Sequence, residues 1–311
     1  QHAPELLSYI QQIVDNNNQK GFFILTGSNH LLLLEKITQS LAGRAAILNL
    51  LPFSMNELAL YNQDFETDEY LYKGFYPAIY SENQEPLFFY RNYFATYIER
   101  DVRQLINVKD YQLFQTFIKL CASRIGQIFN ANKLANEVGV SHHTIKSWMS
   151  ILQISYVVYL LPPYYKNIGK RLIKSSKLYF YDVGLAAYLL DIEKISHIKS
   201  HPLRGELFEN LVINEFMKSR SNQGLEPNLY FYRDSHHNEV DLIQPSGDRL
   251  KTVEIKSAQT FHPNFCKNLD YFENLFKEHV DQKLVIYTGA TETNFKNTQI
   301  LNYKTLLINK E

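Results

Sequence analysis

Two acidic residues and a lysine stand at spacings that could carry a metal-dependent reaction. Asp241 lies in a segment of alternating apolar and polar residues, 239–244, and Glu254 and Lys256 lie in a second such segment, 250–256. A Pro-Ser-Gly-Asp sequence of turn-forming composition separates the two segments. Alternation with a period of two on both sides of such a turn predicts an antiparallel β-hairpin.

If the turn is centred on its Gly-Asp dipeptide, Asp241 lies opposite Glu254, and Glu239 lies opposite Lys256. These four charged side chains then share one face of the hairpin. The core-facing set is apolar and consists of Val240, Leu242, Val253 and Ile255. Carboxylates in opposed positions, with Cβ atoms about 4.5–5.5 Å apart, repel each other. A hard cation such as Mg²⁺ or Mn²⁺ would offset this repulsion, and Lys256 could stabilise phosphate charge or position water.

The order Asp241, twelve residues, Glu254, one residue, Lys256 resembles the core of the PD-(D/E)XK nucleases, although polar residues replace the proline of that motif. In that family a preceding helix supplies a further acid, and Glu209 in the Leu-Phe-Glu-Asn sequence matches it. The resemblance implies a restriction-endonuclease-like α/β domain over residues 201–311, in which all four residues are catalytic and the three carboxylates bind Mg²⁺. Two alternatives stay open: a solvated face of ion pairs, and a nuclease-like fold that binds without cleaving.

A helix-turn-helix is predicted around Gly139. Leu134, Ala135 and Val138 line one face of a short helix, Gly139 permits a tight turn, and Ser141 can cap a second helix. The apolar face of that second helix consists of Ile145, Trp148, Met149 and Leu152. Its outward face, which could reach phosphates or base edges, carries His142, His143 and Lys146.

A basic loop follows the second helix. An apolar strand at residues 156–161 and a Pro-Pro break precede it, and a second strand at 178–181 comes after it. The loop contains no acidic residue, and its cations are Lys166, Lys170, Arg171, Lys174 and Lys177. Helices followed by a basic β-wing predict a winged helix over residues 111–200 that contacts DNA phosphates. The alternatives are a protein-docking module and a merely solvated loop.

Residues 1–61 alternate between helical and strand-like patterns. Apolar runs at 22–25 and 45–51 are separated by a Leu-rich helical stretch, and Ser54 with Glu57 forms a capping box that opens another helix. Such alternation predicts part of a layered α/β unit with a parallel sheet.

Much of the chain resembles bacterial and archaeal AAA-type ATPases joined to a C-terminal domain of unknown function. The stretches that carry the resemblance are HAPELL, ILTGS, SLAGR, LLPFSMNEL, YIERDV, GVSHHT, GKRLIK, KLYFYDVGL, LFEN, NEVD and VEIKS. The resemblance implies that residues 1–61 are the C-terminal part of a P-loop ATPase core. In that core Ser28 would sense the γ-phosphate, and Arg44 would read phosphate charge from a neighbouring subunit of a homo-oligomer. The alternative for Arg44 is a solvated residue between a helix and a strand.

The sequence contains no G-x-x-x-x-G-K-[ST] loop. In the family this loop lies just ahead of the region where the present chain starts. We therefore expect ATP binding of the full-length protein only, with an N-terminal part that precedes these residues.

The amino-acid composition limits which binding partners and which cellular compartment we expect for the protein. The 311 residues include 32 Lys and Arg and 32 Asp and Glu, so any attraction to DNA has to come from local clusters of charge. The two cysteines show no metal-ligand spacing and favour a reducing cytoplasm. No apolar run approaches the roughly 18–20 residues that cross a bilayer, so no membrane association is expected. The predicted class is α/β and α+β multidomain, with residues 62–110 as a helical linker or lid.

Overall fold

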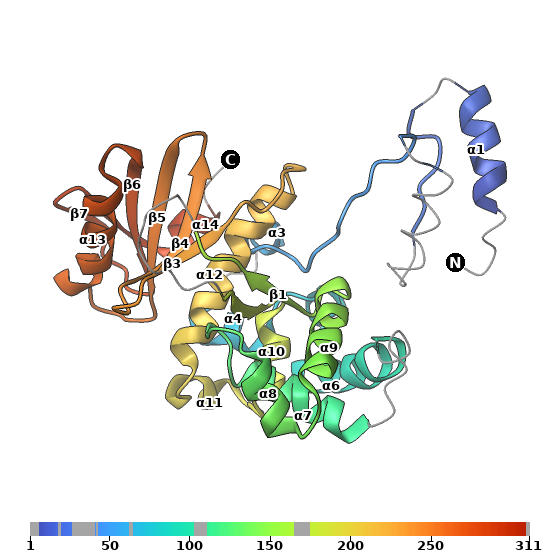
Figure 1. Ribbon diagram of the computed structural model, residues 1–311, viewed down its shortest axis with the longest axis horizontal. Helices are drawn as coiled ribbons and strands as arrows, with labels where there is room; N and C mark the ends of the chain where they lie inside the picture. The colour runs from blue at the N-terminus through green and yellow to red at the C-terminus, as the bar shows by residue number, and fades with distance from the viewer. Residues whose placement is uncertain are drawn as a thin grey trace. The chain divides into compact units, whose positions relative to one another are not determined.

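The computed structural model consists of two compact units (Figure 1). The units are Gln1–Leu50 and Leu51–Glu311. The residues described are 6–17, 20–26, 41, 43–61, 65–102, 111–164 and 175–308. None of the described helices has both the length and the apolar character needed to cross a bilayer.

The first unit contains one helix among its described residues, α1 (Leu6–Asn16). The two predicted strands are not formed there, because residues 22–26 and 45–50 have no regular secondary structure. Their apolar side chains lie exposed, with Ile24 at 93% and Leu50 at 99%. A strand needs a paired neighbour for its backbone and a covering layer for its apolar face, and the described part of this unit provides neither. The predicted Leu-rich helix lies largely outside the described residues.

Residues 51–200 of the second unit fold mainly into helices. The helices and the π-helix η1 are α3 (Met55–Leu60), α4 (Thr67–Lys73), α5 (Pro77–Ser81), α6 (Pro86–Tyr93), η1 (Phe94–Val102), α7 (Tyr111–Ala122), α8 (Ala131–Val138), α9 (His142–Ile154), α10 (Val183–Leu189) and α11 (Ile195–Ser200). The predicted capping box opens α3: Ser54 Oγ accepts from Glu57 N, and the Glu57 carboxylate accepts from Ser54 N. Asp182 caps α10 by accepting from Leu185 N.

The elements of the predicted helix-turn-helix are present. Helices α8 and α9 are separated by Gly139, whose φ of +80° lies in the left-handed region that glycine favours. The apolar face of α9 is buried as predicted, through Ile145, Trp148, Met149 and Leu152. After α9, β1 (Val158–Leu161) pairs antiparallel with β2 (Lys177–Phe180). The identification of these elements as a DNA-binding winged helix stays a prediction.

Residues 201–308 form a mixed sheet with helices packed on it. The strands are β3 (Tyr230–Arg233), β4 (Glu239–Ser246), β5 (Arg249–Lys256), β6 (Val280–Tyr287), β7 (Thr293–Phe295) and β8 (Thr298–Asn302), in the order β3-β4-β5-β6-β8-β7. The pairs β5–β6 and β6–β8 are parallel, and the other pairs are antiparallel. The helices are α12 (Arg204–Ser221), η2 (Pro263–Cys266), α13 (Lys267–Phe276), η3 (Lys277–His279) and α14 (Tyr303–Ile308). Helix α13 packs an apolar cluster against β4, β5 and β6, and α12 also packs against β5 (Figure 1).

The predicted hairpin is formed by β4 and β5 with the predicted turn. Gly247, at φ +63°, and Asp248 connect the strands, and the ladder runs from Ser246 opposite Arg249 to Leu242 opposite Val253. Asp241 and Glu254 of this hairpin are buried, whereas Glu239 and Lys256 are partly exposed, so protein covers much of the polar side of the hairpin. Alternation along a strand separates its two faces, but it does not tell whether a helix elsewhere in the chain covers the polar one.

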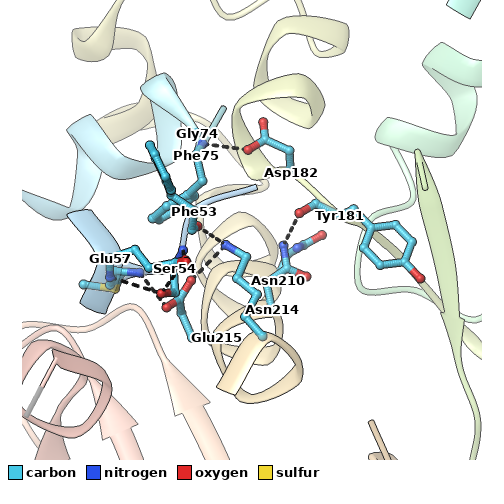
Figure 2. Close-up of polar contacts among 12 residues, drawn as sticks. Phe53, Ser54, Glu57, Gly74, Phe75, Tyr181, Asp182, Asn210, Asn214 and Glu215 are labelled. Atoms are coloured by element: carbon cyan, nitrogen blue, oxygen red, sulfur yellow. Dashed lines mark hydrogen bonds and ion pairs between the residues drawn. The ribbon is translucent and has the colours of Figure 1, made fainter. Parts of the chain in front are cut away.

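Helix α12 ties the two regions of this unit together through buried polar side chains (Figure 2). These are Asn210, Asn214, Glu215 and Lys218, each less than 5% exposed. The amide of Asn210 bonds both the N and the O of Phe180, the last residue of β2. The Glu215 carboxylate accepts from Met55 N at 2.7 Å, at the start of α3. Since buried polar groups stabilise only when they are paired, these contacts fix α12 against β2 and α3.

Candidate active site

The four residues predicted to be catalytic come together at one place in the second unit. Glu209 projects from α12, Asp241 from β4, and Glu254 and Lys256 from β5. The Nζ of Lys256 lies 2.7 Å from Glu254 Oε1 and 3.7 Å from Asp241 Oδ2. Glu209 interacts electrostatically with Asp241 and with Glu254. Three acids remote in the sequence therefore share one electrostatic environment.

Two carboxylates of this cluster are buried, and the side chain of the third, Glu209, is 14% exposed. Asp241 and Glu254 are 6% and 4% exposed, so the solvated ion-pair face that the sequence left open is not what the structure contains. Asp241 Oδ2 accepts from the backbone N of Ile255 at 2.8 Å. Glu254 Oε2 is buried without a hydrogen-bond partner. A buried carboxylate oxygen without a hydrogen-bond partner lowers the stability of the folded state, unless a proton or a cation binds to it.

Two residues of the cluster were not predicted to belong to it, Lys177 and Tyr179 on β2. The sequence analysis placed Lys177 among the cations of the basic loop, and that placement is wrong. The side chain of Lys177 is only 2% exposed. Its Nζ lies 2.9 Å from Glu209 Oε1 and 2.5 Å from Glu239 Oε1. The Tyr179 hydroxyl also donates to Glu209 Oε1. The only sequence signal was that Lys177 directly precedes an apolar strand and shares a strand face with Tyr179.

The β4–β5 ladder ends at Leu242 opposite Val253, so the predicted pairing of Glu239 with Lys256 is not part of it. Glu239 pairs instead with Lys177 and with Arg233, whose Nη1 lies 3.3 Å from Glu239 Oε2. The register of β3 on β4 shifts between the pairs Tyr230–Ile243 and Tyr232–Val240, next to the pair Arg233–Glu239. A strand irregularity changes the direction of the side chains around it, and a turn sequence remote from it gives no sign of that shift.

Burial raises the pKa of two of the acids. The pKa of Glu209 rises to about 7, first through burial and then through the charge of Asp241, while Lys177 opposes the rise. The pKa of Glu254 rises to about 8 through burial and the charge of Asp241, while Lys256 opposes the rise. Burial alone would lower the pKa of Lys256, but Asp241 and Glu254 outweigh it and hold that pKa above its ordinary value. Buried acids whose pKa values are raised in this way are typical of sites that bind cations or move protons.

Glu254→Gln is expected to stabilise the metal-free protein, with a gain that grows with pH. Because the pKa of Glu254 is about 8 when folded against an ordinary 4.5, the folded state binds more protons between these values, and its stability falls as pH rises through that window. Removing the charge should change the free energy of unfolding little below pH 4.5 and raise it by on the order of 2 kcal/mol at pH 8.

Urea unfolding at pH 4.5, 6.5 and 8 in EDTA measures this gain. The exposed Glu278, changed to Gln, serves as the control and should alter the free energy of unfolding by less than about 0.5 kcal/mol at each pH. A Glu254→Gln protein that is less stable than wild type at pH 8 would contradict the prediction.

The donor set of the cluster suits a divalent cation held by two carboxylates. Asp241 and Glu254 both approach the same lysine Nζ, and Glu254 Oε2 is an unsatisfied oxygen. Mg²⁺ commonly takes one or two protein carboxylates and keeps several waters. Within the described ranges, no three His, Cys, Asp or Glu side chains are placed to hold a metal ion. The three-carboxylate site with Glu209 therefore stays a prediction.

The residues predicted to contact DNA are only partly described. On α9, His143 and Lys146 are exposed and His142 is half-buried, and all three flank the buried apolar face. Lys166, Lys170, Arg171 and Lys174 lie outside the described residues.

Of the residues predicted to contact nucleotide, Arg44 is described and Ser28 is not. Within the first unit, the Arg44 guanidinium pairs with the Asp15 carboxylate, with Nη2 3.2 Å from Oδ2. The side chain of Arg44 is 39% exposed.

Family models match three successive parts of the chain. An AAA domain model matches residues 1–59, a domain of unknown function (DUF8612) matches 64–196, and a domain of unknown function (DUF4143) matches 204–306. The first and last matches are consistent with an AAA-like protein of an ATPase family. All four predicted catalytic residues fall in the third matched region, whereas Lys177 and Tyr179 fall in the second.

The chain is also similar to bacterial proteins described only as uncharacterized. Proteins of Mycobacterium tuberculosis and Mycobacterium bovis are each 28% identical to it over 263 residues, which cover 84% of this chain. A protein of Haemophilus influenzae is 27% identical over 271 residues, which cover 82% of this chain. The chain spans 58% of the length of the two mycobacterial proteins and 64% of the third. No solved structure matches this chain.

Proposed function

We propose that this chain is the DNA-acting part of an AAA-type ATPase-family protein, and that its C-terminal domain cleaves phosphodiester bonds with Mg²⁺. The observation that carries the proposal is the meeting of Glu209, Asp241 and Glu254 beside Lys256. Support comes from the burial of these acids and from the elements that carry them, a helix and a hairpin. An unrelated surface cluster would have neither feature.

Each residue of the cluster has a role in this proposal. Asp241 and Glu254 would hold the cation, which when bound would supply Lewis-acid polarisation of a phosphoryl oxygen and would lower the pKa of a bound water. Glu254 has to release its proton before it can act as a ligand, and Lys256 beside it favours that release. The Lys256 side chain is 34% exposed, and in this proposal its ammonium would also contact a phosphate. Glu209 adds negative charge from α12.

Incubation with supercoiled plasmid tests the cleavage directly. We expect nicked and linear products with Mg²⁺ or Mn²⁺ and none with EDTA, because the carboxylates need a divalent cation to act on phosphate. Intact plasmid under every divalent cation, at a protein concentration that retards the DNA, would exclude the nuclease function.

DNA binding is proposed for the exposed face of α9 and for the basic loop. Affinity for duplex DNA should fall steeply with salt, because lysine-phosphate contacts release counterions. Lys146→Ala is expected to reduce the slope of log affinity against log salt by about one, in measurements between low and physiological salt. Lys199→Ala, an exposed lysine on α11, is the control and should leave the slope unchanged. Affinity that does not vary with salt would remove the DNA-binding proposal.

Nucleotide binding is proposed for the complete protein. Its basis is the AAA domain match at residues 1–59 together with the predicted roles of Ser28 and Arg44. A homo-oligomer in which Arg44 exchanges Asp15 for the phosphate of a neighbouring subunit is part of this proposal.

A second candidate function is a non-catalytic module that holds DNA or a protein. The observation that favours it is the pairing of the acids with two lysines, Glu209 with Lys177 and Glu254 with Lys256. Ion pairs of this kind can neutralise a degenerate site. DNA binding without cleavage in the plasmid experiment would select this function.

A further inference from the structure

The candidate active site is lined on one side by a strand from another region of the chain. Lys177 and Tyr179 lie two residues apart on β2, so both side chains leave the same face of the strand. Both donate to the same atom, Glu209 Oε1, and Lys177 also pairs with Glu239. Lys177 is 2% exposed and Tyr179 is fully buried.

The strand that carries these two residues is fixed to α12. The Asn210 amide bonds the N and O of Phe180 at 2.8 and 2.9 Å, and Asn214 Nδ2 donates to Phe180 O at 3.0 Å. Asn214 Nδ2 also donates to Tyr181 O at 3.1 Å (Figure 2). Asn210 directly follows Glu209 on the helix. The backbone of β2 and the carboxylate of Glu209 are therefore held in one hydrogen-bonded assembly, which leaves the Glu209 side chain little freedom.

We infer that Lys177 and Tyr179 of β2 are positioning residues for Glu209, so that the candidate metal site is completed across two regions of the chain. This inference rests on the proposed metal-dependent function. Both donors engage Oε1, and neither bonds Oε2. The second oxygen is thereby kept in a defined direction. Groups that orient a carboxylate near a metal contribute to metal affinity without touching the ion.

Tyr179→Phe tests the inference because it removes one donor to Glu209 without changing any charge. Lys177 still pairs with Glu209 in this variant, so the buried acid keeps a partner. Tyr159→Phe is a matched control: Tyr159 lies opposite Tyr179 on β1, and its hydroxyl donates to Asn214 Oδ1 at 2.9 Å. Both variants remove one hydrogen-bonded hydroxyl from the same pair of strands, and thermal unfolding checks that both are folded.

The measurement is the binding of Mn²⁺, followed by the electron paramagnetic resonance signal of the free ion in the absence of DNA. We expect Tyr179→Phe to weaken Mn²⁺ binding about tenfold and Tyr159→Phe to change it by less than about twofold. Equal affinities for wild type and Tyr179→Phe would overturn the inference, and so would equal losses in the two variants.

The same titration separates this inference from the proposed function. If wild type binds Mn²⁺ but leaves plasmid intact, cleavage is excluded, while the ratio between the two tyrosine variants still decides the role of Tyr179. If wild type binds no Mn²⁺, the inference and the metal chemistry of the proposed function are both overturned.

Discussion

Asp241→Asn is expected to lower magnesium-dependent DNA cleavage by about a thousandfold, which corresponds to roughly 4 kcal/mol of lost transition-state stabilisation. The asparagine keeps an oxygen that can accept from Ile255 N, so the hairpin should stay folded. What the substitution removes is one of the two carboxylate charges that would hold the cation. The measurement is the initial rate of plasmid nicking under saturating Mg²⁺, compared with wild type.

Asp270→Asn is the control for that experiment. Asp270 also pairs with a buried lysine in the same domain, since its Oδ1 lies 2.7 Å from Lys283 Nζ, but it projects from α13 and shows no charge interaction with the candidate site. The rate of Asp270→Asn should remain within about threefold of wild type if only the cation-binding charge matters. Equal loss in the two variants would mean that cleavage responds to general destabilisation.

The hairpin of the candidate site could be predicted because all its determinants are local. A Gly-Asp turn and alternation on both sides set the register, and the observed pairs from Leu242–Val253 to Ser246–Arg249 follow it. The same holds for α8 and α9, where Gly139 and Ser141 sit at the ends of two short apolar patterns. Short-range signals of this kind are contained within the segment that they organise.

The contribution of β2 to the candidate site could not be predicted from the sequence. It depends on contacts with α12, a helix that follows β2 in the chain. Lys177 follows a run of cations, and nothing near it indicates that Glu209 and Glu239 will enclose it. The sequence around the polar residues of α12 likewise gives no sign that they are buried. A helix that is buried on nearly all sides has no polar face, so Asn210 and Lys218 resemble solvent-facing positions until their partners are known.

Family matching and packing divide the chain at different places. The AAA domain match ends at residue 59, yet the compact unit that contains α12 begins at Leu51. Phe53 and Met55 therefore belong to the first matched region by sequence and to the second unit by contact. The buried pair of Glu215 and Lys218 makes that attachment: Lys218 Nζ donates to Phe53 O at 2.6 Å, and Glu215 Oε2 accepts from Met55 N at 2.7 Å.

Lys218→Met is expected to destabilise the second unit by about 3–5 kcal/mol, because it leaves the Glu215 carboxylate buried without a counter-ion. Both side chains are 3% exposed, and Lys218 Nζ lies 3.0 Å from Glu215 Oε1. Lys119→Met provides the comparison: its partner Asp191 lies at a similar distance of 2.9 Å, but the two side chains are 52% and 76% exposed. That variant should lose less than about 1 kcal/mol. Urea unfolding measures both losses.

The double variant Lys218→Met/Glu215→Leu shows where the loss comes from. If the unpaired carboxylate is the cause, removing it as well should restore part of the free energy of unfolding that Lys218→Met loses, since apolar side chains can replace a buried ion pair at little cost. The restoration should be incomplete, because the Lys218 bond to Phe53 O and the Glu215 bond to Met55 N are lost as well. A double variant no more stable than Lys218→Met would show that these backbone bonds, and not the opposed charges, hold α12 to the start of α3.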